Sequence, residues 1–234
     1  MASLLSRNRR SRDTLPSRRG LVDVAGPAAE PFRTLRLALE LRPETRRGKT
    51  IVFTSPNLGD GKSTVAANYA LIASLSQQRV LLIDSDLRHP VLHELFQVPR
   101  GPGLIDVLGK HKTMAECVRD VNFLGQVDLL TAGTPVPRVG DVMSSAAMSD
   151  LLDAAISTYD AVVLDTPPTL EASDAATLAA RPDVDVALIV NGKGKRRPVL
   201  RALRKLELID ANVLGLVVNR EGSLSTYGYG YTPS

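Results

Sequence analysis

The sequence has little with which to build covalent cross-links or cysteine-bound cofactors. Its 234 residues include a single cysteine, Cys117, and no tryptophan. One thiol cannot close an internal disulfide, and it cannot supply the cysteine cluster that structural zinc or iron–sulfur sites normally need. The composition is otherwise ordinary, with 44% apolar and 23% charged residues, which predicts a globular domain of moderate size.

Long hydrophobic runs are also absent. The longest nearly apolar stretch, residues 65–75, is interrupted by Asn68. It is well short of the roughly 20 residues that a membrane-spanning helix requires. The first five residues are too few for the apolar region of a secretory signal, and arginines follow them. The sequence therefore predicts a reduced, cytoplasmic protein.

Positive charge is concentrated near the N-terminus. Residues 1–50 carry twelve Lys and Arg against five Asp and Glu, whereas the rest of the chain carries seventeen against twenty. The first arginines lie among Ser, Asn, Pro and Gly without apolar periodicity, which predicts a disordered basic arm over residues 1–28. Such an arm could lie on anionic lipid and recruit the protein peripherally to the inner face of the cell membrane, or it could be a solvated tail. No recognition motif accompanies the charge, so no specific nucleic acid is expected as a partner.

From residue 50 onward, short β-branched runs alternate with helical patterns. Several of the runs are apolar throughout, which is typical of strands that helices cover on both faces. We expect an α/β fold with a doubly wound, mostly parallel sheet over residues 29–220, which gathers its ligand at one edge of the sheet. The expected strands are 50–54, 79–84, 127–131, 161–165, 184–190 and 213–219, and the expected helices are 62–75, 147–157, 173–181 and 198–209.

A phosphate-binding loop lies between the first expected strand and helix, at residues 55–64 (SPNLGDGKST). Its glycines allow backbone N–H groups to turn toward phosphate oxygens, and the helix that follows adds the positive end of its dipole. Lys62 would meet the β- and γ-phosphates, Ser63 would bind Mg²⁺ and Thr64 would reach the α-phosphate. Pro56 stands where the common pattern has its first glycine. The predicted nucleotide-binding residues of the loop are Gly59, Asp60, Gly61, Lys62, Ser63 and Thr64.

Two further strands end in carboxylates. Asp84 and Asp86 follow one apolar run, and Asp165 ends another. Carboxylates in such places can hold Mg²⁺, directly or through water, beside a bound ATP. We predict Ser63, Asp84 and Asp165 as metal ligands and Lys62, Asp84 and Asp86 as catalytic residues; the choice of Asp84 or Asp86 as the base stays open. Asn219, at the end of the last strand, is either a nucleotide-binding residue or a turn asparagine.

These residues resemble the bacterial tyrosine kinase (BY-kinase) family, the cytoplasmic CapB/CpsD-like group of capsule and exopolysaccharide biosynthesis. In this family a second Walker motif, here residues 80–88, lies between Walker A and Walker B. The resemblance runs from about residue 30 to the C-terminus and includes residues 103–108, 165–168 and 173–175. It implies a P-loop NTPase fold of the deviant Walker, ParA/MinD-like superfamily. It also implies a protein-tyrosine kinase that converts ATP and protein tyrosine to ADP and phosphotyrosine.

The same resemblance implies an assembly. Glu30, Arg33 and Arg36 match the family's E-x-x-R-x-x-R subunit-contact motif, which would form a homo-oligomer such as a ring. The same three residues could instead form a solvated ion-pair face within one chain. Because no membrane segment is expected, the chain resembles the split form of the family. In that form a separate transmembrane activator of the polysaccharide co-polymerase type is a partner, and a tyrosine phosphatase would reset the kinase.

Tyrosine is concentrated at the C-terminus. Three of the five tyrosines, Tyr227, Tyr229 and Tyr231, lie within the last eight residues and are separated by glycines. A flexible tail over residues 221–234 can enter a neighbour's active site and present one hydroxyl after another, or it can be a low-complexity end. The tail resembles the family's phosphoacceptor cluster, which implies autophosphorylation in trans.

Two other functions are compatible with these motifs. A ParA/MinD-type ATPase shares the fold, but that class carries a signature lysine five residues before the loop lysine, where this chain has Asn57. A nucleotide-dependent scaffold that transfers no phosphate would retain every motif and have no use for the tail.

Overall fold

The computed structural model describes residues 20–40, 50–121, 126–135 and 145–220. The predicted arm up to residue 19 and the tail at 221–234, with its three tyrosines, lie outside the described residues. The strands are β1 (Thr50–Thr54), β2 (Arg79–Asp84), β3 (Arg119–Asp120), β4 (Gln126–Leu130), β5 (Ala161–Asp165), β6 (Val184–Asn191) and β7 (Asn212–Asn219). The helices are the 3₁₀ turn η1 (Pro27–Ala29) and the α-helices α1 (Glu30–Glu40), α2 (Lys62–Ser74), α3 (Leu92–Phe96), α4 (Leu104–Leu108), α5 (Met114–Cys117), α7 (Ala146–Thr158), α8 (Asp174–Ala179) and α9 (Arg196–Glu207).

The strands form one seven-stranded sheet in the order β3-β4-β2-β5-β1-β6-β7. The neighbours from β4 to β7 pair in parallel, and β3 pairs with β4 in the antiparallel direction. In this register Asp84 lies opposite Asp165, and Phe53, one residue before the end of β1, lies opposite Asp165 on the other side. Because parallel strands end at the same edge, the predicted acidic residues and the phosphate loop meet there.

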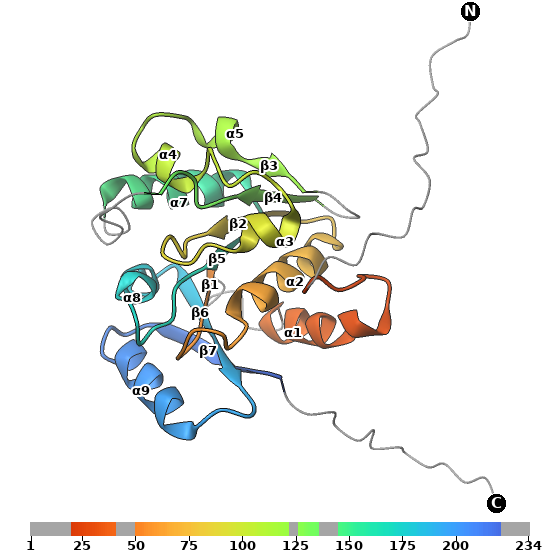
Figure 1. Ribbon diagram of the computed structural model, residues 1–234, viewed down its shortest axis with the longest axis vertical. Helices are drawn as coiled ribbons and strands as arrows, with labels where there is room; N and C mark the ends of the chain where they lie inside the picture. Colours follow the sequence, from red (N-terminus) through yellow and green to blue (C-terminus); the bar gives the residue numbers. More distant parts are fainter. Residues whose placement is uncertain (1–19, 41–49, 122–125, 136–144, 221–234) are drawn as a thin grey trace, which may run out of the picture.

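Helices cover both faces of the sheet (Figure 1), with α1, α2 and α3 on one side and α7, α8 and α9 on the other. Twelve of the 13 residues of α2 are buried, because the helix packs against both the sheet and α1. This position explains why α2 is apolar on nearly every side. The α/β fold with a mostly parallel, doubly wound sheet is confirmed.

The N-terminal boundary differs from the prediction. Residues 20–28 were expected in the disordered arm, yet Val24 is buried and the backbone N–H of Val22 donates to Asn68 Oδ1 at 2.8 Å. The Asn68 amide in turn donates to the carbonyl of Gly20 at 2.8 Å. A buried amide in α2 needs hydrogen-bond partners, and this segment supplies them. The ordered domain therefore begins before residue 29.

The expected strands and long helices agree with the structure to within two residues at each end. The short elements α3, α4, α5 and β3 were not predicted, because elements of five residues or fewer show no measurable periodicity. In the described ranges, no helix combines the length and apolar character needed to cross a membrane.

Candidate active site

The loop between β1 and α2 leaves backbone donors available. Gly59 and Gly61 have φ values of +82° and +96°, in the left-handed region that favours glycine. A Cβ atom on Gly61 would collide with the side-chain amide of Asn219. Among the described residues, no protein acceptor bonds the backbone N–H groups of residues 59–63, which comprise the end of the loop and the first two residues of α2. This arrangement fits a nucleotide phosphate, because it offers several N–H groups and the positive end of a helix dipole.

Side chains of the loop region hold its shape. The Asp60 carboxylate accepts a hydrogen bond from the backbone N–H of Asn57 at 2.9 Å. The Asn219 amide donates to the carbonyl of Asp60 at 2.9 Å, so the end of β7 also contacts the loop. Asp60 and Asn219 were predicted as nucleotide-binding residues, and in the structure both support the loop backbone.

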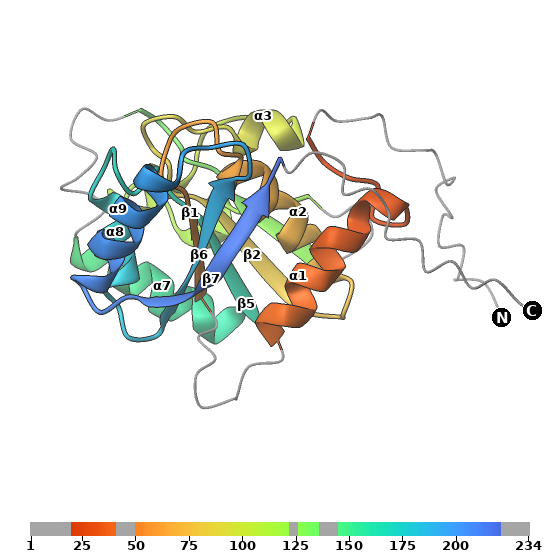
Figure 2. The ribbon, with the colours of Figure 1, turned by 90° about the horizontal axis from the view of Figure 1, so that it is seen from below.

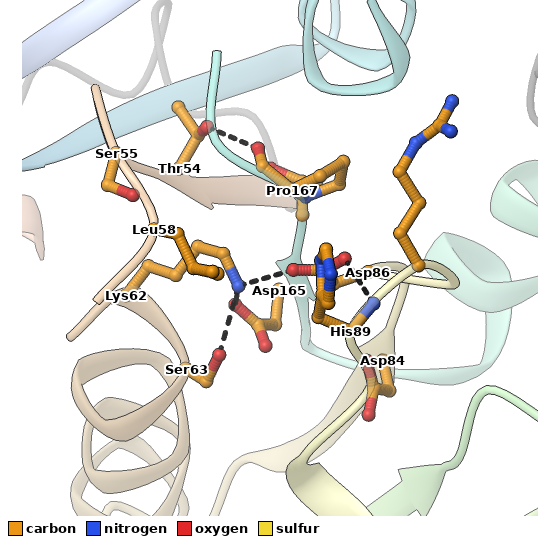
Figure 3. Close-up of polar contacts among 12 residues, drawn as sticks. Thr54, Ser55, Leu58, Lys62, Ser63, Asp84, Asp86, His89, Asp165 and Pro167 are labelled. Atoms are coloured by element: carbon orange, nitrogen blue, oxygen red, sulfur yellow. Dashed lines mark hydrogen bonds and ion pairs between the residues drawn. The ribbon is translucent and has the colours of Figure 1, made fainter. Parts of the chain in front are cut away.

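Lys62 lies between the carboxylates of two motifs (Figure 3). Its Nζ is 2.7 Å from Asp86 Oδ2 and 3.5 Å from Asp165 Oδ1. The same ammonium donates to the hydroxyl of Ser63 at 3.1 Å. The two carboxylates are fully buried and the lysine side chain is 7% exposed. The phosphate loop and the acidic strand ends are thus one site.

The electrostatics of this cluster are unbalanced, because three buried aspartates surround one lysine. Burial lowers the pKa of Lys62, but the charges of Asp165 and Asp86 outweigh burial and raise it overall. Burial raises the pKa of Asp84 well above its usual value, and the charge of Asp165 adds to the effect. Burial also raises the pKa of Asp165 to about 6, against the opposing attraction of Lys62. An additional cation at this edge would therefore be favoured.

Backbone groups fix two of the carboxylates and leave some oxygens unused. Leu92 N–H donates to Asp84 Oδ2 and His89 N–H donates to Asp86 Oδ1, each at 3.0 Å. Asp84 Oδ1 and Asp165 Oδ2 are buried without a hydrogen-bond partner. Within the described ranges, no three His, Cys, Asp or Glu side chains converge as ligands of a single ion. Mg²⁺ commonly uses only one or two carboxylates together with phosphate oxygens and water, so the orphaned oxygens and Ser63 fit it.

Two further acidic residues belong to this region and were not among the predicted site residues. Asp174, at the start of α8, is almost fully buried and accepts from Arg88 Nε at 3.2 Å. Glu171 accepts from the backbone N–H of Leu58, at the tip of the phosphate loop, at 3.2 Å. Arg88 and Asp174 both lie in segments that resemble the family, and this resemblance could have marked them as residues of the site. The contacts themselves join residues far apart in the sequence.

The predicted subunit-contact residues lie on α1, and the described chain pairs them within itself. Arg33 binds Glu30 at 2.8 Å and donates to the carbonyl of Val24 at 2.6 Å. Arg36 lies 3.2 Å from Glu40 and also donates to the hydroxyl of Ser76. This is the ion-pair face that the sequence left open as an alternative, and it joins α1 to the segment before it and to the end of α2.

Comparison with known proteins identifies the family. A family profile described as an AAA domain matches residues 48–192. The tyrosine-protein kinase YwqD of Bacillus subtilis is 34% identical over 97% of this chain and 95% of its own length. The chain belongs to the bacterial tyrosine-protein kinases. Nucleotide binding follows from that membership. The kinase domain of the Escherichia coli tyrosine kinase ETK superposes on this kinase with a TM-score of 0.82 and 29% identity, over 96% of this chain and 89% of that one.

Not all relatives have the same length. The tyrosine-protein kinase etk of Escherichia coli is 28% identical over 88% of this kinase, which spans 28% of that protein. The cell division ATPase MinD of Pyrococcus furiosus is 22% identical with a TM-score of 0.62, over 75% of this chain and 73% of that one. At that identity the likeness shows the shared fold alone.

Proposed function

We propose that this chain is an ATP-dependent tyrosine autokinase that phosphorylates Tyr227, Tyr229 and Tyr231 of another copy in trans. The observation that supports the proposal best is the 2.7 Å contact between Lys62 and Asp86, which joins the phosphate loop to the second acidic motif. Phosphoryl transfer to a hydroxyl needs a positioned proton acceptor, and this contact places a carboxylate beside the lysine that would meet the phosphates.

The chain's residues have separate tasks in this proposal. The free N–H groups of residues 59–63 bind phosphate oxygens, and Lys62 exchanges its carboxylate partners for the β- and γ-phosphates. Ser63, Asp84 and Asp165 hold Mg²⁺, which supplies neutralisation of the negative charge on the transferring phosphoryl group. Thr64 lies one residue further along α2 and would approach the α-phosphate.

A tyrosine hydroxyl is a poor nucleophile while it is protonated, with a reference pKa near 10. Asp84 and Asp86 are the two carboxylates that could accept its proton. Asp86 lies in direct contact with Lys62, and the pKa of Asp84 is raised by burial. The pH–rate profiles of Asp84→Asn and Asp86→Asn would assign the base, because only loss of the base removes the acidic limb of the profile.

The regulation that we propose follows the family resemblance. The kinase would act on exopolysaccharide or capsule synthesis and export, at the inner face of the membrane, through a separate transmembrane activator. A tyrosine phosphatase would reset it. Glu30, Arg33 and Arg36 would also contact the next subunit of a homo-oligomer, in addition to their contacts within the chain.

The decisive experiment incubates the purified full chain with labelled ATP and Mg²⁺, with and without the cytoplasmic segment of an activator, and maps the modified residues. Lys62→Ala should reduce tail phosphorylation on the order of 100-fold or more. That variant also leaves buried carboxylates without their cation, so Lys62→Arg, which keeps the charge, serves as the second variant. Lys112→Ala, at an exposed site, is the matched control.

Each outcome has a clear meaning. Loss of phosphotyrosine in both Lys62 variants, with normal labelling in Lys112→Ala, supports the autokinase. Undiminished phosphotyrosine in the Lys62 variants would contradict it. ATP hydrolysis by the wild type without any phosphotyrosine would instead favour the nucleotide-dependent scaffold or a partition-type ATPase.

A further inference from the structure

A basic surface on α9 and the turn before it has no role in the site described above. Within residues 193–207 the only acidic residue is Glu207. None of the basic side chains that are exposed there makes an ion pair with any described residue. We call this set the α9 basic surface; its members are Lys193, Lys195, Arg196, Arg197, Arg201 and Arg204.

The stability of the helix does not explain this surface. The first turn of α9 contains Arg196 and Arg197 and no acidic residue, although positive charge is unfavourable at that end of the helix dipole. Arg197 and Arg201 are four residues apart, a spacing at which like charges repel. Lys205 differs from the set, because it donates to the carbonyls of Thr169 and Ala172. Arg196, Arg197 and Arg201 therefore carry an energetic cost that a ligand of opposite charge would remove, whereas Arg204 lies in the last turn, where positive charge suits the helix dipole.

The surface begins where the chain's C-terminal segment departs. β6 and β7 end at the same edge of the sheet (Figure 2), and the backbone N–H of Gly192 donates to the carbonyl of Asn219 at 2.8 Å. The turn into α9 is thus in contact with the end of β7. Leu200 is 43% exposed and lies three and four residues from Arg197 and Arg196, on the same side of the helix. The surface combines guanidinium groups with an apolar contact.

We propose that the α9 basic surface binds the phosphotyrosines of the chain's own C-terminal segment, residues 221–234. This inference rests on the proposed function, because that reaction creates the ligand. Three phosphates add roughly −4.5 to −6 charges to the segment and Glu221 adds one more, against the six positive charges of the surface. Arginine pairs with phosphate through two parallel hydrogen bonds, and Leu200 offers an aromatic ring an apolar neighbour.

The lengths involved allow this contact. Arg197 is five residues after Gly192, so it lies within about 18 Å of the end of β7. Tyr227 is eight residues after Asn219, and an extended chain of that length reaches up to about 28 Å. Tyrosines two residues apart point to one side of an extended segment at intervals of about 7 Å. Arg197, Arg201 and Arg204 follow one another along α9 at about 6 Å and 4.5 Å.

Anionic lipid is the other ligand that would suit positive charge. Phosphotyrosine is favoured because four of the six basic residues are arginines and an exposed leucine lies among them. It is also favoured because the turn before α9 contacts the end of β7, which immediately precedes the acceptor segment in the sequence. Binding to the α9 basic surface would hold the phosphorylated C-terminal segment away from Asp84, Asp86 and Asp165.

The test measures binding of a synthetic, fluorescein-labelled peptide of residues 221–234, phosphorylated at all three tyrosines, to the dephosphorylated full chain without ATP. The test variant is Arg197→Gln/Arg201→Gln/Arg204→Gln. The matched control, Arg79→Gln/Lys110→Gln/Lys112→Gln, removes the same charge from exposed positions elsewhere. We expect at least tenfold weaker binding in the test variant, less than twofold change in the control, and little binding of the unphosphorylated peptide.

A second arm uses vesicles of phosphatidylcholine with 30% phosphatidylserine. Equal phosphopeptide affinity in the test and control variants would overturn the inference. A test variant that loses only its vesicle binding would also overturn it, and would identify the surface as a lipid contact. Because the peptide is synthetic, its binding can be measured whether or not the chain phosphorylates itself. A failure of the proposed autokinase activity can therefore be distinguished from a failure of this inference.

Discussion

Lys62 is the residue on which the charge balance of the site depends. It is the only cation in contact with Asp86 and Asp165 among the described residues, and it also bonds Ser63. The same ammonium that neutralises these buried carboxylates is the group proposed to meet the phosphates. Binding of Mg·ATP would therefore exchange one set of ion pairs for another, so that little buried charge is left uncompensated at any stage.

At neutral pH, Asp84 should lower the free energy of unfolding of the ligand-free protein. Its folded-state pKa is raised, so the folded chain holds its proton more tightly than the unfolded chain does. Stability from this group is therefore present below the unfolded pKa and is lost as pH rises through the folded pKa. Asp84→Asn removes the charge and keeps an acceptor for Leu92 N–H, so we expect the free energy of unfolding to rise by about 1 kcal/mol at pH 7.5.

Chemical denaturation between pH 4 and 8 checks this prediction. The difference between Asp84→Asn and the wild type should shrink toward pH 4, where about half of the unfolded carboxyl is itself protonated. Ser85→Ala, at the adjacent buried position, serves as a control without a charge change. A variant less stable than the wild type at pH 7.5 would show that the Asp84 charge is compensated in the folded protein.

At the scale of the elements, Tyr159 connects two strands of the sheet to a helix. It follows α7 and precedes β5, and its hydroxyl donates to Asp128 Oδ2 in β4 at 2.8 Å. Burial raises the pKa of Tyr159, and both the hydrogen bond to Asp128 and the negative charge of Asp128 raise it further. We expect Tyr159→Phe to lower the free energy of unfolding by about 1–2 kcal/mol, because it leaves a carboxylate without its donor. Urea denaturation measures this loss of stability. Asp128→Asn should be less destabilising, because it keeps an acceptor for the Tyr159 hydroxyl. An unchanged denaturation midpoint in Tyr159→Phe would refute the role of this hydrogen bond.

Helix α1 should contribute to assembly through the two arginines that also bind within the chain. Arg33→Ala/Arg36→Ala should shift the protein toward monomer in light scattering, at concentrations where the wild type is associated. Exposed ion pairs contribute about 1 kcal/mol or less, so the variant should keep most of its thermal stability. Glu40→Ala disturbs the ion pair with Arg36 but leaves the motif intact, so its mass should stay that of the wild type. An unchanged oligomer in the double variant would restrict these arginines to the intrachain contacts.

The elements differ in how far the sequence predicts them. Strands such as β5 are apolar throughout and end in a motif residue, so composition and spacing locate them, and parallel pairing then places Asp84 beside Asp165. The contact of Arg88 with Asp174 joins residues 86 positions apart, and no local pattern indicates it. The α9 basic surface was also missed, because net charge over residues 51–234 hides charges that gather only once one side of a helix is buried.

At the scale of the whole molecule, one edge of the sheet carries both signs of charge. Asp84, Asp86 and Asp165 lie in its centre, and the α9 basic surface begins beside the end of β7. An unphosphorylated tail carries little charge and can enter a neighbour's acidic site. Each phosphorylation adds about −1.5 to −2 charges, so a modified tail is repelled by the carboxylates and attracted by α9.

Phosphorylation should therefore loosen the assembly, because it removes the tail from the neighbouring site and makes adjacent tails repel each other. The mass distributions of phosphorylated wild type, Lys62→Arg and the variant with Tyr227, Tyr229 and Tyr231 changed to Phe are compared at equal concentration with Mg·ATP. The two forms that cannot be phosphorylated should stay associated, and the phosphorylated wild type should dissociate. Phosphatase treatment should restore the larger mass, which separates charge repulsion from damage to the protein. Equal association in all three forms would mean that the tail is modified without any control over assembly.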